Sequence, residues 1–262
     1  NNVTIPDSVQ TIGAGAFYNC SSLKEVNLKG VQTIGAAAFY ASGIIGVDTS
    51  AASIGELAFC DCKSLTSAKI NGAKYIGVGA FLGSALQTVE MNAVTAVGAN
   101  AFTDTRLTTV TLPSSLSEYS REKTLTLYSQ SSGKLEEKQV FEPSVGSGAF
   151  AGIPTLTQIA VADGNDVFFS ENGVLYAKVA NGYALVQYPA GKDGGSYEIK
   201  SGTVRIEADA FNGVSVLKKV VLPADVTSIG ARAFYKSSVN DYTFKSVRVP
   251  NLDSEYVDVT GV

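Results

Sequence analysis

Residues 5–23 read IPDSVQTIGAGAFYNCSSL, and parts of this stretch return along almost the whole chain. Its centre is the six-residue pattern Ile-Gly-x-x-Ala-Phe, which ends at Phe17. Clear copies end at Phe39, Phe59 and Phe81, and near matches end at Phe102, Phe150, Phe211 and Phe234. The first five phenylalanines are 20 to 22 residues apart, which is too short a period for ankyrin or tetratricopeptide units. The sequence therefore predicts a repeat protein built of short coils.

A second pattern, Leu-x-x-Val-x-Leu, follows the phenylalanine, first at Leu23, Val26 and Leu28. Its last positions alternate as in a β-strand, so Glu25 and Asn27 face away from the apolar residues. A single coil cannot bury its own apolar side chains, and stacked coils must therefore share one core. We interpret the repeated Ile, Ala, Phe, Leu and Val residues as that core. The repeated glycines are expected to supply tight or positive-φ backbone.

The pattern Ile-Pro-x-x-Val-x-x-Ile-Gly-x-x-Ala-Phe-x-x-Cys-x-x-Leu at residues 5–23 resembles the BspA-like leucine-rich repeat, and the period agrees with it. The resemblance covers most of the chain. It implies a leucine-rich-repeat solenoid of the α/β horseshoe class, here mainly β with short helical turns, and we count about eight coils. It also implies a bacterial cell-surface or secreted protein that binds host or microbial proteins, and it brings no catalytic residues.

Two segments interrupt the repeat within what we expect to be a single domain, residues 1–262. Residues 117–143 lack the pattern and are expected to form an inserted hairpin, most simply a solvated flap. Residues 163–198 contain two Asn-Gly turn signals and are expected to form an inserted β module, after which Ile199 re-enters the coil. A last strand is expected over residues 244–250, followed by a cap or linker at 251–262.

Composition excludes several function classes. The chain contains no histidine, so Ser/His/Asp and Cys/His nucleophile systems and histidine-containing zinc sites are ruled out. The acidic residues are scattered, the chain lacks Trp, and we expect neither enzymatic activity nor a cofactor. The net charge of -4 and the absence of a Lys/Arg-rich run argue against nucleic acid. No apolar stretch is long enough for membrane insertion.

The three cysteines are not expected to form a disulfide or a metal site. Cys20 and Cys62 occupy equivalent positions two coils apart, a separation of ~10 Å that a disulfide cannot span. Cys60 takes the place of Tyr18 and Tyr40 in the other coils, and we expect its thiol to be partly exposed.

Two surfaces are candidates for partner binding. The outward positions of the strands form columns that include Lys69, Thr88, Glu90, Thr109 and Thr111, although these residues equally suit an ordinary solvated sheet. The other surface is the column after each phenylalanine, where Tyr18 and Tyr40 should lie side by side.

We predict a non-catalytic, monomeric module for protein recognition or adhesion at the cell surface or after secretion. The alternatives are a carbohydrate-binding accessory domain, since a glycan could use the tyrosines, and a passive spacer in a larger protein. The sequence begins inside a repeat, so we expect this chain to be part of a longer protein.

Overall fold

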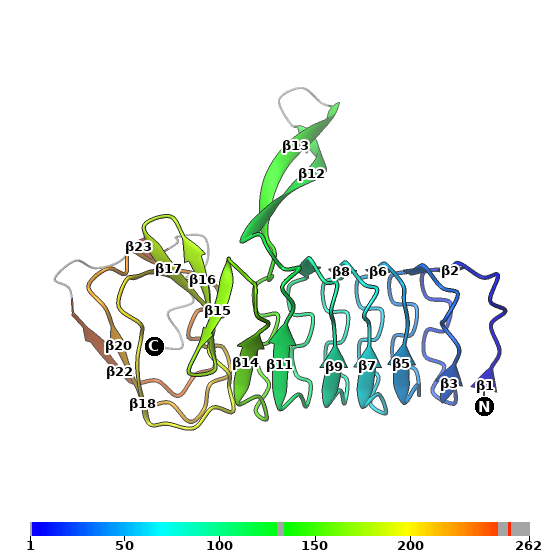
Figure 1. The fold of residues 1–262 in the computed structure, drawn as a ribbon, viewed down its shortest axis with the longest axis horizontal. Helices are drawn as coiled ribbons and strands as arrows, with labels where there is room; N and C mark the ends of the chain where they lie inside the picture. Colours follow the sequence, from blue (N-terminus) through cyan, green and yellow to red (C-terminus); the bar gives the residue numbers. More distant parts are fainter. Residues whose placement is uncertain (1, 130–133, 246–250, 253–262) are drawn as a thin grey trace.

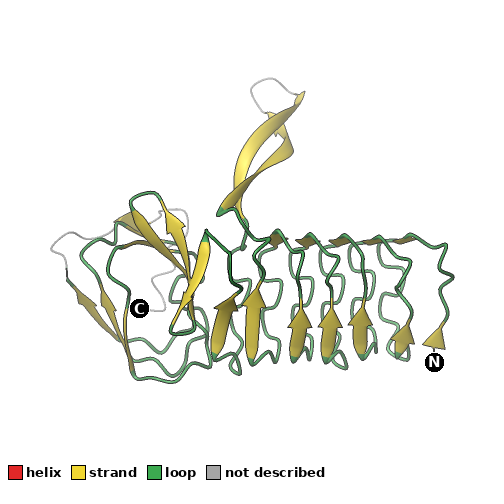
Figure 2. Ribbon diagram, in the orientation of Figure 1, coloured by secondary structure: helices red, strands yellow, loops and turns green. Residues whose placement is uncertain are grey.

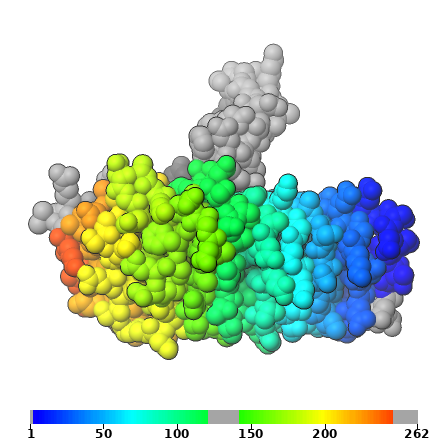
Figure 3. Space-filling view, in the orientation of Figure 1, coloured from blue at the N-terminus to red at the C-terminus, as the bar shows by residue number. Residues whose placement is uncertain are grey.

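The computed structural model describes residues 2–129, 134–245 and 251–252. The coils follow one another in chain order along the long axis of an elongated solenoid (Figures 1 and 3). Each coil carries a short strand on one side, and all coils but that of Phe150 carry another on a second side (Figure 2). Most neighbouring strands on each side pair in parallel. This is the leucine-rich-repeat solenoid that the sequence predicts.

One side of the solenoid is a row of strands that we call the ladder. Most of its strands come from the Leu-x-x-Val-x-Leu pattern, and within them buried and exposed residues alternate, as Ala68 is buried between exposed Ser67 and Lys69. The ladder strands are β1 (Asn2–Val3), β3 (Glu25–Val26), β5 (Gly46–Asp48), β7 (Ser67–Lys69), β9 (Thr88–Glu90), β11 (Thr109–Leu112), β14 (Gln158–Val161), β18 (Ser196–Glu198), β20 (Lys219–Leu222) and β22 (Asp241–Phe244).

A second side is built from the residues around the repeated Ile-Gly pair. Successive isoleucines pair in register and are buried, as Ile34 with Ile54 and Ile76 next in line. Its strands are β2 (Thr11–Ile12), β4 (Thr33–Ile34), β6 (Ser53–Ile54), β8 (Tyr75–Ile76), β10 (Ala96–Val97), β17 (Gly182–Gln187), β19 (Thr203–Ile206), β21 (Ser228–Ile229) and β23 (Asn251–Leu252).

The phenylalanines of successive coils stack through the centre of the solenoid. From Phe17 to Phe150 the ring centroids of neighbours are 5.0–5.4 Å apart, with interplanar angles of at most 13°. This separation is close to the spacing of ~4.8 Å between neighbouring β-strands, so one coil contributes one ring. The stack confirms that the repeated phenylalanines are core residues.

The corner that contains the phenylalanine is a series of turns. We expected short helical turns, but the described residues contain no helix, and none that could cross a membrane. The residues two before and two after the phenylalanine have positive φ, for example 54° at Leu57 and 56° at Asp61. A left-handed residue reverses the local chain direction, so a right-handed helix cannot propagate through the corner.

The repeated glycines serve close packing of coils rather than positive φ. Gly55 has no positive φ, and a Cβ atom placed on it would lie 2.6 Å from the backbone nitrogen of Ala36 in the preceding coil. Gly35, Gly77 and Gly98 show the same close approach, at 2.5–2.7 Å. Gly13 in the first coil has nothing within 4 Å of that position. Of the two roles expected for these glycines, the tight backbone is therefore the correct one.

The segment at residues 117–143 holds β12 (Ser120–Ser129) and β13 (Lys134–Pro143), which pair antiparallel. The two strands project from the body of the solenoid (Figure 1). At their base the Tyr119 hydroxyl donates a hydrogen bond to Glu207, which belongs to a coil beyond the second insertion. The base of the projection therefore rests against both halves of the solenoid.

The second insertion ends earlier than expected. β15 (Phe168–Glu171), β16 (Val174–Val179) and β17 form an antiparallel meander, and β17 then pairs in parallel with β19. The range 163–198 was too long, because β18 is already a ladder strand paired with β20, so the coil resumes before Ile199. The last ladder strand was also misplaced: β22 begins at Asp241 and reaches Phe244, while residues 246–250 lie outside the described residues.

Counted by ladder strands, the described residues form ten coils rather than about eight. One missed coil lacks the Ile-Gly-x-x-Ala-Phe motif and uses Tyr188 in its place, stacked on Phe211 at 5.3 Å. The Tyr188 backbone N–H donates to the Ala210 carbonyl, as the Phe81 N–H does to Ala101 in a regular coil. The other unpredicted ladder strand is β1, which precedes the first motif.

The coil of Tyr188 has no phenylalanine corner, so the corners on either side of it meet directly. The N–H of Gly152 donates to the Asn212 carbonyl across this gap. There the fully buried Asp209 accepts hydrogen bonds from Ser147 of the first half and from Arg232 of the following coil, the latter at 2.8 and 3.1 Å. A buried carboxylate needs such partners, and here they join the two halves of the solenoid.

Replacement of Gly55 by alanine should lower the free energy of unfolding by about 1–3 kcal/mol, because the new methyl group meets backbone rather than a movable side chain. The matched variant Gly13→Ala meets open space and should leave stability unchanged or raise it by up to about 1 kcal/mol. Urea unfolding followed by circular dichroism measures both. Equal effects would contradict this interpretation of the glycines.

Asp209→Asn should destabilise the protein by about 1–3 kcal/mol, because Arg232 loses its buried counter-ion while the positive φ of 59° remains acceptable to asparagine. Asp104→Asn is the control: this residue also has positive φ but is exposed, so the change should be within about 0.5 kcal/mol. Thermal unfolding of the two variants measures the loss of stability in each. Equal losses would show that the hydrogen bonds of Asp209 do not stabilise the contact between the two halves.

Candidate binding surfaces

The ladder presents two exposed side chains per strand, and the predicted candidates lie there. β9 exposes Thr88 and Glu90, and β11 exposes Thr109 and Thr111. The outward residues of neighbouring strands line up in columns, as expected. Ser67 of β7 pairs with Thr88 of β9, and Lys69 pairs with Glu90. The Lys69 ammonium and the Glu90 carboxylate are 3.7 Å apart and more than half exposed, so this ion pair stabilises the fold very little.

The columns are interrupted after β14. Gln158 pairs with Thr109, and the next ladder strand along the chain is β18, which begins at Ser196 and pairs with β20. No pairing joins β14 to β18 among the described strands. Instead, the Ile159 N–H of β14 donates to the Gly173 carbonyl in the β15–β16 turn, so the ladder is split at the coil that carries the inserted β module.

Tyr18 and Tyr40 stack as the sequence predicts, with ring centroids 4.9 Å apart and an interplanar angle of 7°. Tyr18 is 55% exposed, while Tyr40 is half-buried and donates a hydrogen bond to Asp61. Cys60 and Asp61 together raise the pKa of the Tyr40 phenol above its usual value. Tyr40 therefore stays a neutral donor, and Tyr18 is the member of the pair that offers a surface.

The expectation that Cys60 is partly exposed was wrong. Its side chain is buried, because Tyr40 and Leu82 occupy the same position in the two neighbouring coils and are much larger. Burial raises the pKa of the Cys60 thiol to about 11. Cys62 is buried as well, and its thiol contacts Ser42 and the Phe39 carbonyl. All three cysteines are free.

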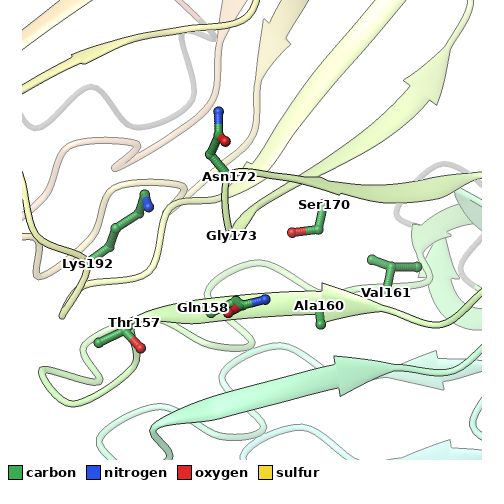
Figure 4. A pocket seen from close by; sticks show the side chains of 8 residues that line it. All are labelled: Thr157, Gln158, Ala160, Val161, Ser170, Asn172, Gly173 and Lys192. Carbon is green, nitrogen blue, oxygen red and sulfur yellow. The ribbon is translucent and has the colours of Figure 1, made fainter.

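A cleft of about 480 Å³ lies where the ladder is split (Figure 4). Gln158 and Ala160 of β14 lie on one side of it, and the β15–β16 turn with Asn172 and Gly173 overhangs them. Lys192 reaches toward the cleft from the loop that follows β17. The remaining lining residues are Thr157, Val161 and Ser170.

Sequence reasoning found the parts of this cleft but not their assembly. Asn172-Gly173 is one of the two Asn-Gly turn signals in the sequence, and Gln158 continues the column of outward strand residues that includes Thr109. Nothing in the sequence indicated that this turn folds back over β14 or that Lys192 approaches it from a distant loop. The signal that could have pointed to a binding site here is the number of polar residues in and around the insertion.

The described residues contain no group of three or more acidic or cysteine side chains arranged to hold a metal ion. The inserted module begins with a turn at Asp163 and Gly164. The Asn165 side chain donates to the carbonyls of Pro113 and Leu116 and accepts from the N–H groups of Val167 and Phe168. It thereby ties the start of the insertion to the preceding coil.

Comparison with known proteins agrees with this architecture. A model of the BspA type leucine-rich repeat region matches the chain in six copies, over residues 1–105, 53–171 and 193–256. The chain belongs to this BspA-type family. No protein with curated annotation matches the sequence.

Two solved structures are similar to this chain along most of its length. A leucine-rich cell surface protein of Faecalibacterium prausnitzii is 30% identical with a TM-score of 0.72, and the match covers 93% of this chain and 60% of that one. The pneumococcal vaccine antigen PcpA is 23% identical with a TM-score of 0.62, over 95% of this chain and 51% of that one. The BspA-type chain described here thus spans about half to 60% of these relatives, and PcpA shows likeness of fold alone.

Thiol alkylation at pH 8 should distinguish the cysteines. With a pKa of about 11, roughly one Cys60 side chain in a thousand is a thiolate at this pH, against about one in four for an ordinary cysteine. Iodoacetamide should therefore modify half-buried Cys20 first and leave Cys60 and Cys62 unmodified until the protein unfolds. Mass spectrometry of tryptic peptides reads the order, and rapid labelling of Cys60 in the folded protein would contradict its burial.

Proposed function

We propose that this chain is a non-catalytic, monomeric protein-recognition module that acts at the bacterial cell surface or after secretion, and that the ladder is its contact face. The support for the location is membership of a family in which the Faecalibacterium prausnitzii relative is a cell surface protein. The observation that carries the choice of face is the unused hydrogen-bonding capacity of the ladder. Among the described residues, no hydrogen bond involves the side chains of Thr88, Thr109 or Thr111, which are all exposed.

The stacked coils suit this face to recognition. Every outward side chain is held at a fixed spacing by buried neighbours such as Val110 and Ala68, so the surface is organised before a partner arrives. Lys69 and Glu90 add one charge of each sign, and their weak mutual pairing is easily exchanged for pairing with a partner. Tyr18 extends the contact area at the first corner with an exposed aromatic ring.

The double variant Thr88→Arg/Thr109→Arg tests this face, because two bulky charges on adjacent ladder positions should weaken partner binding at least tenfold, or about 1.4 kcal/mol. Thr11→Arg/Thr33→Arg is the matched control on the second sheet, where both threonines are exposed and lie in adjacent coils, as Thr88 and Thr109 do on the ladder. Binding of the labelled chain is measured on intact bacterial and host cells, before and after protease treatment of the cells.

Loss of binding after protease treatment and in the ladder variant alone would support protein recognition through the ladder. Binding that survives protease treatment would instead favour a carbohydrate-binding accessory domain, and absence of all binding would favour a passive spacer. Equal loss in both double variants would place the contact away from the ladder.

A further inference from the structure

The cleft at the split in the ladder has walls that are fixed by hydrogen bonds. The Ile159 N–H donates to the Gly173 carbonyl at 2.9 Å, and the Ser170 hydroxyl donates to the Ile159 carbonyl at 2.6 Å. On the other side, the Gly191 N–H donates to the Leu156 carbonyl at 2.8 Å. Both the overhanging turn and the loop that carries Lys192 are therefore held against the β14 coil. A ligand would find the cleft already formed.

The side chains that line the cleft are mostly polar and uncharged. Thr157 and Ser170 use their hydroxyl groups on backbone carbonyls, which leaves Gln158, Asn172 and Lys192 as the long polar groups available to a ligand. Each amide offers both donors and an acceptor, a combination that matches sugar hydroxyl groups. The cleft volume of about 480 Å³ falls in the usual range for small-molecule sites.

Lys192 brings the one positive charge of the lining, and no carboxylate lines the cleft. Lys192 is half-buried, and its ammonium makes no ion pair with the other described residues. Glu171, which precedes Asn172, is engaged elsewhere, because its carboxylate lies 2.6 Å from the Lys200 ammonium. Asp193 is exposed and lies outside the lining. The cleft therefore favours a ligand with a negative group.

The lining argues against a peptide as ligand. Its apolar side chains are Ala160 and Val161, and it has no aromatic residue, so a protein partner would find no pocket for an anchor side chain. A neutral sugar would leave the Lys192 ammonium without a counter-ion. We propose that this cleft binds a saccharide bearing a carboxylate, with Lys192 pairing with the carboxylate and Gln158 and Asn172 bonding to hydroxyl groups. This site adjoins the ladder face proposed above for protein recognition, since Gln158 belongs to the ladder strand β14, but Asn172 and Lys192 come from the inserted module and the loop that follows it.

Isothermal titration of the full chain with trigalacturonate at low ionic strength tests the proposal, with the neutral galactose trisaccharide and triglutamate as comparison ligands. We expect binding of trigalacturonate that weakens as salt is added, and much weaker binding of the other two. Lys192→Gln should reduce the affinity roughly tenfold through loss of a charge-assisted hydrogen bond. Asn172→Gly should also reduce it, and it retains the positive φ of 52° at this turn.

Two variants serve as matched controls. Lys178→Gln removes an exposed lysine of the same inserted module, and Asn181→Gly removes an asparagine of positive φ from the neighbouring β16–β17 turn. Neither residue lines the cleft, so both variants should bind like the parent. Circular dichroism confirms that all four variants are folded.

The proposal is overturned if trigalacturonate does not bind, or if the neutral trisaccharide binds equally well. Equal binding of triglutamate would reduce the site to a general anion site and would also overturn it. Binding that is insensitive to Lys192→Gln and Asn172→Gly would place the ligand elsewhere on the molecule.

Discussion

The structure depends on the close approach of neighbouring coils at the glycine that follows most of the repeated isoleucines, although Glu207 follows Ile206. Where Gly55 meets the backbone of the preceding coil, a side chain of any size would force the coils apart. That contact holds the coils at the spacing at which parallel strands share hydrogen bonds and phenylalanine rings stack at 5.0–5.4 Å. The core, both sheets and the straight ladder face all follow from this one distance.

The interruptions are tolerated because each coil contacts only its neighbours. The meander of β15 to β17 enters one coil, replaces its phenylalanine corner with Tyr188, and returns the chain to the parallel array through β19. Where the phenylalanine corner is missing, Asp209 joins the two halves of the solenoid by accepting hydrogen bonds from Ser147 on one side and Arg232 on the other. The same insertion splits the ladder and creates the polar cleft, so the structural irregularity and the candidate ligand site have one origin.

The two proposed contact regions differ in kind. The ladder is exposed and repetitive, and it suits a large partner that forms hydrogen bonds with regularly spaced polar side chains. The cleft is open to solvent and bounded by walls that hydrogen bonds hold in place, and its single ammonium at Lys192 suits a small ligand of opposite charge. A repeat scaffold can carry both, since surface residues vary freely while the buried positions keep the coils together.

The sequence alone determined the solenoid, its core residues and the stacking of Tyr18 on Tyr40, because the repeat assigns each of these residues to the same place in successive coils. Local pattern also sufficed to locate both interruptions. It did not reveal the coil of Tyr188, which carries no motif, or the burial of Cys60, which depends on larger residues one coil away on each side.

Only the tertiary structure brought Asn172 and Lys192 over β14, and only there did Ser147 meet Asp209, 62 residues further on. Such contacts join segments whose separation in the sequence does not follow the repeat period. The repeat encodes what lies one coil away, whereas an insertion folds back according to its own hydrogen bonds and packing.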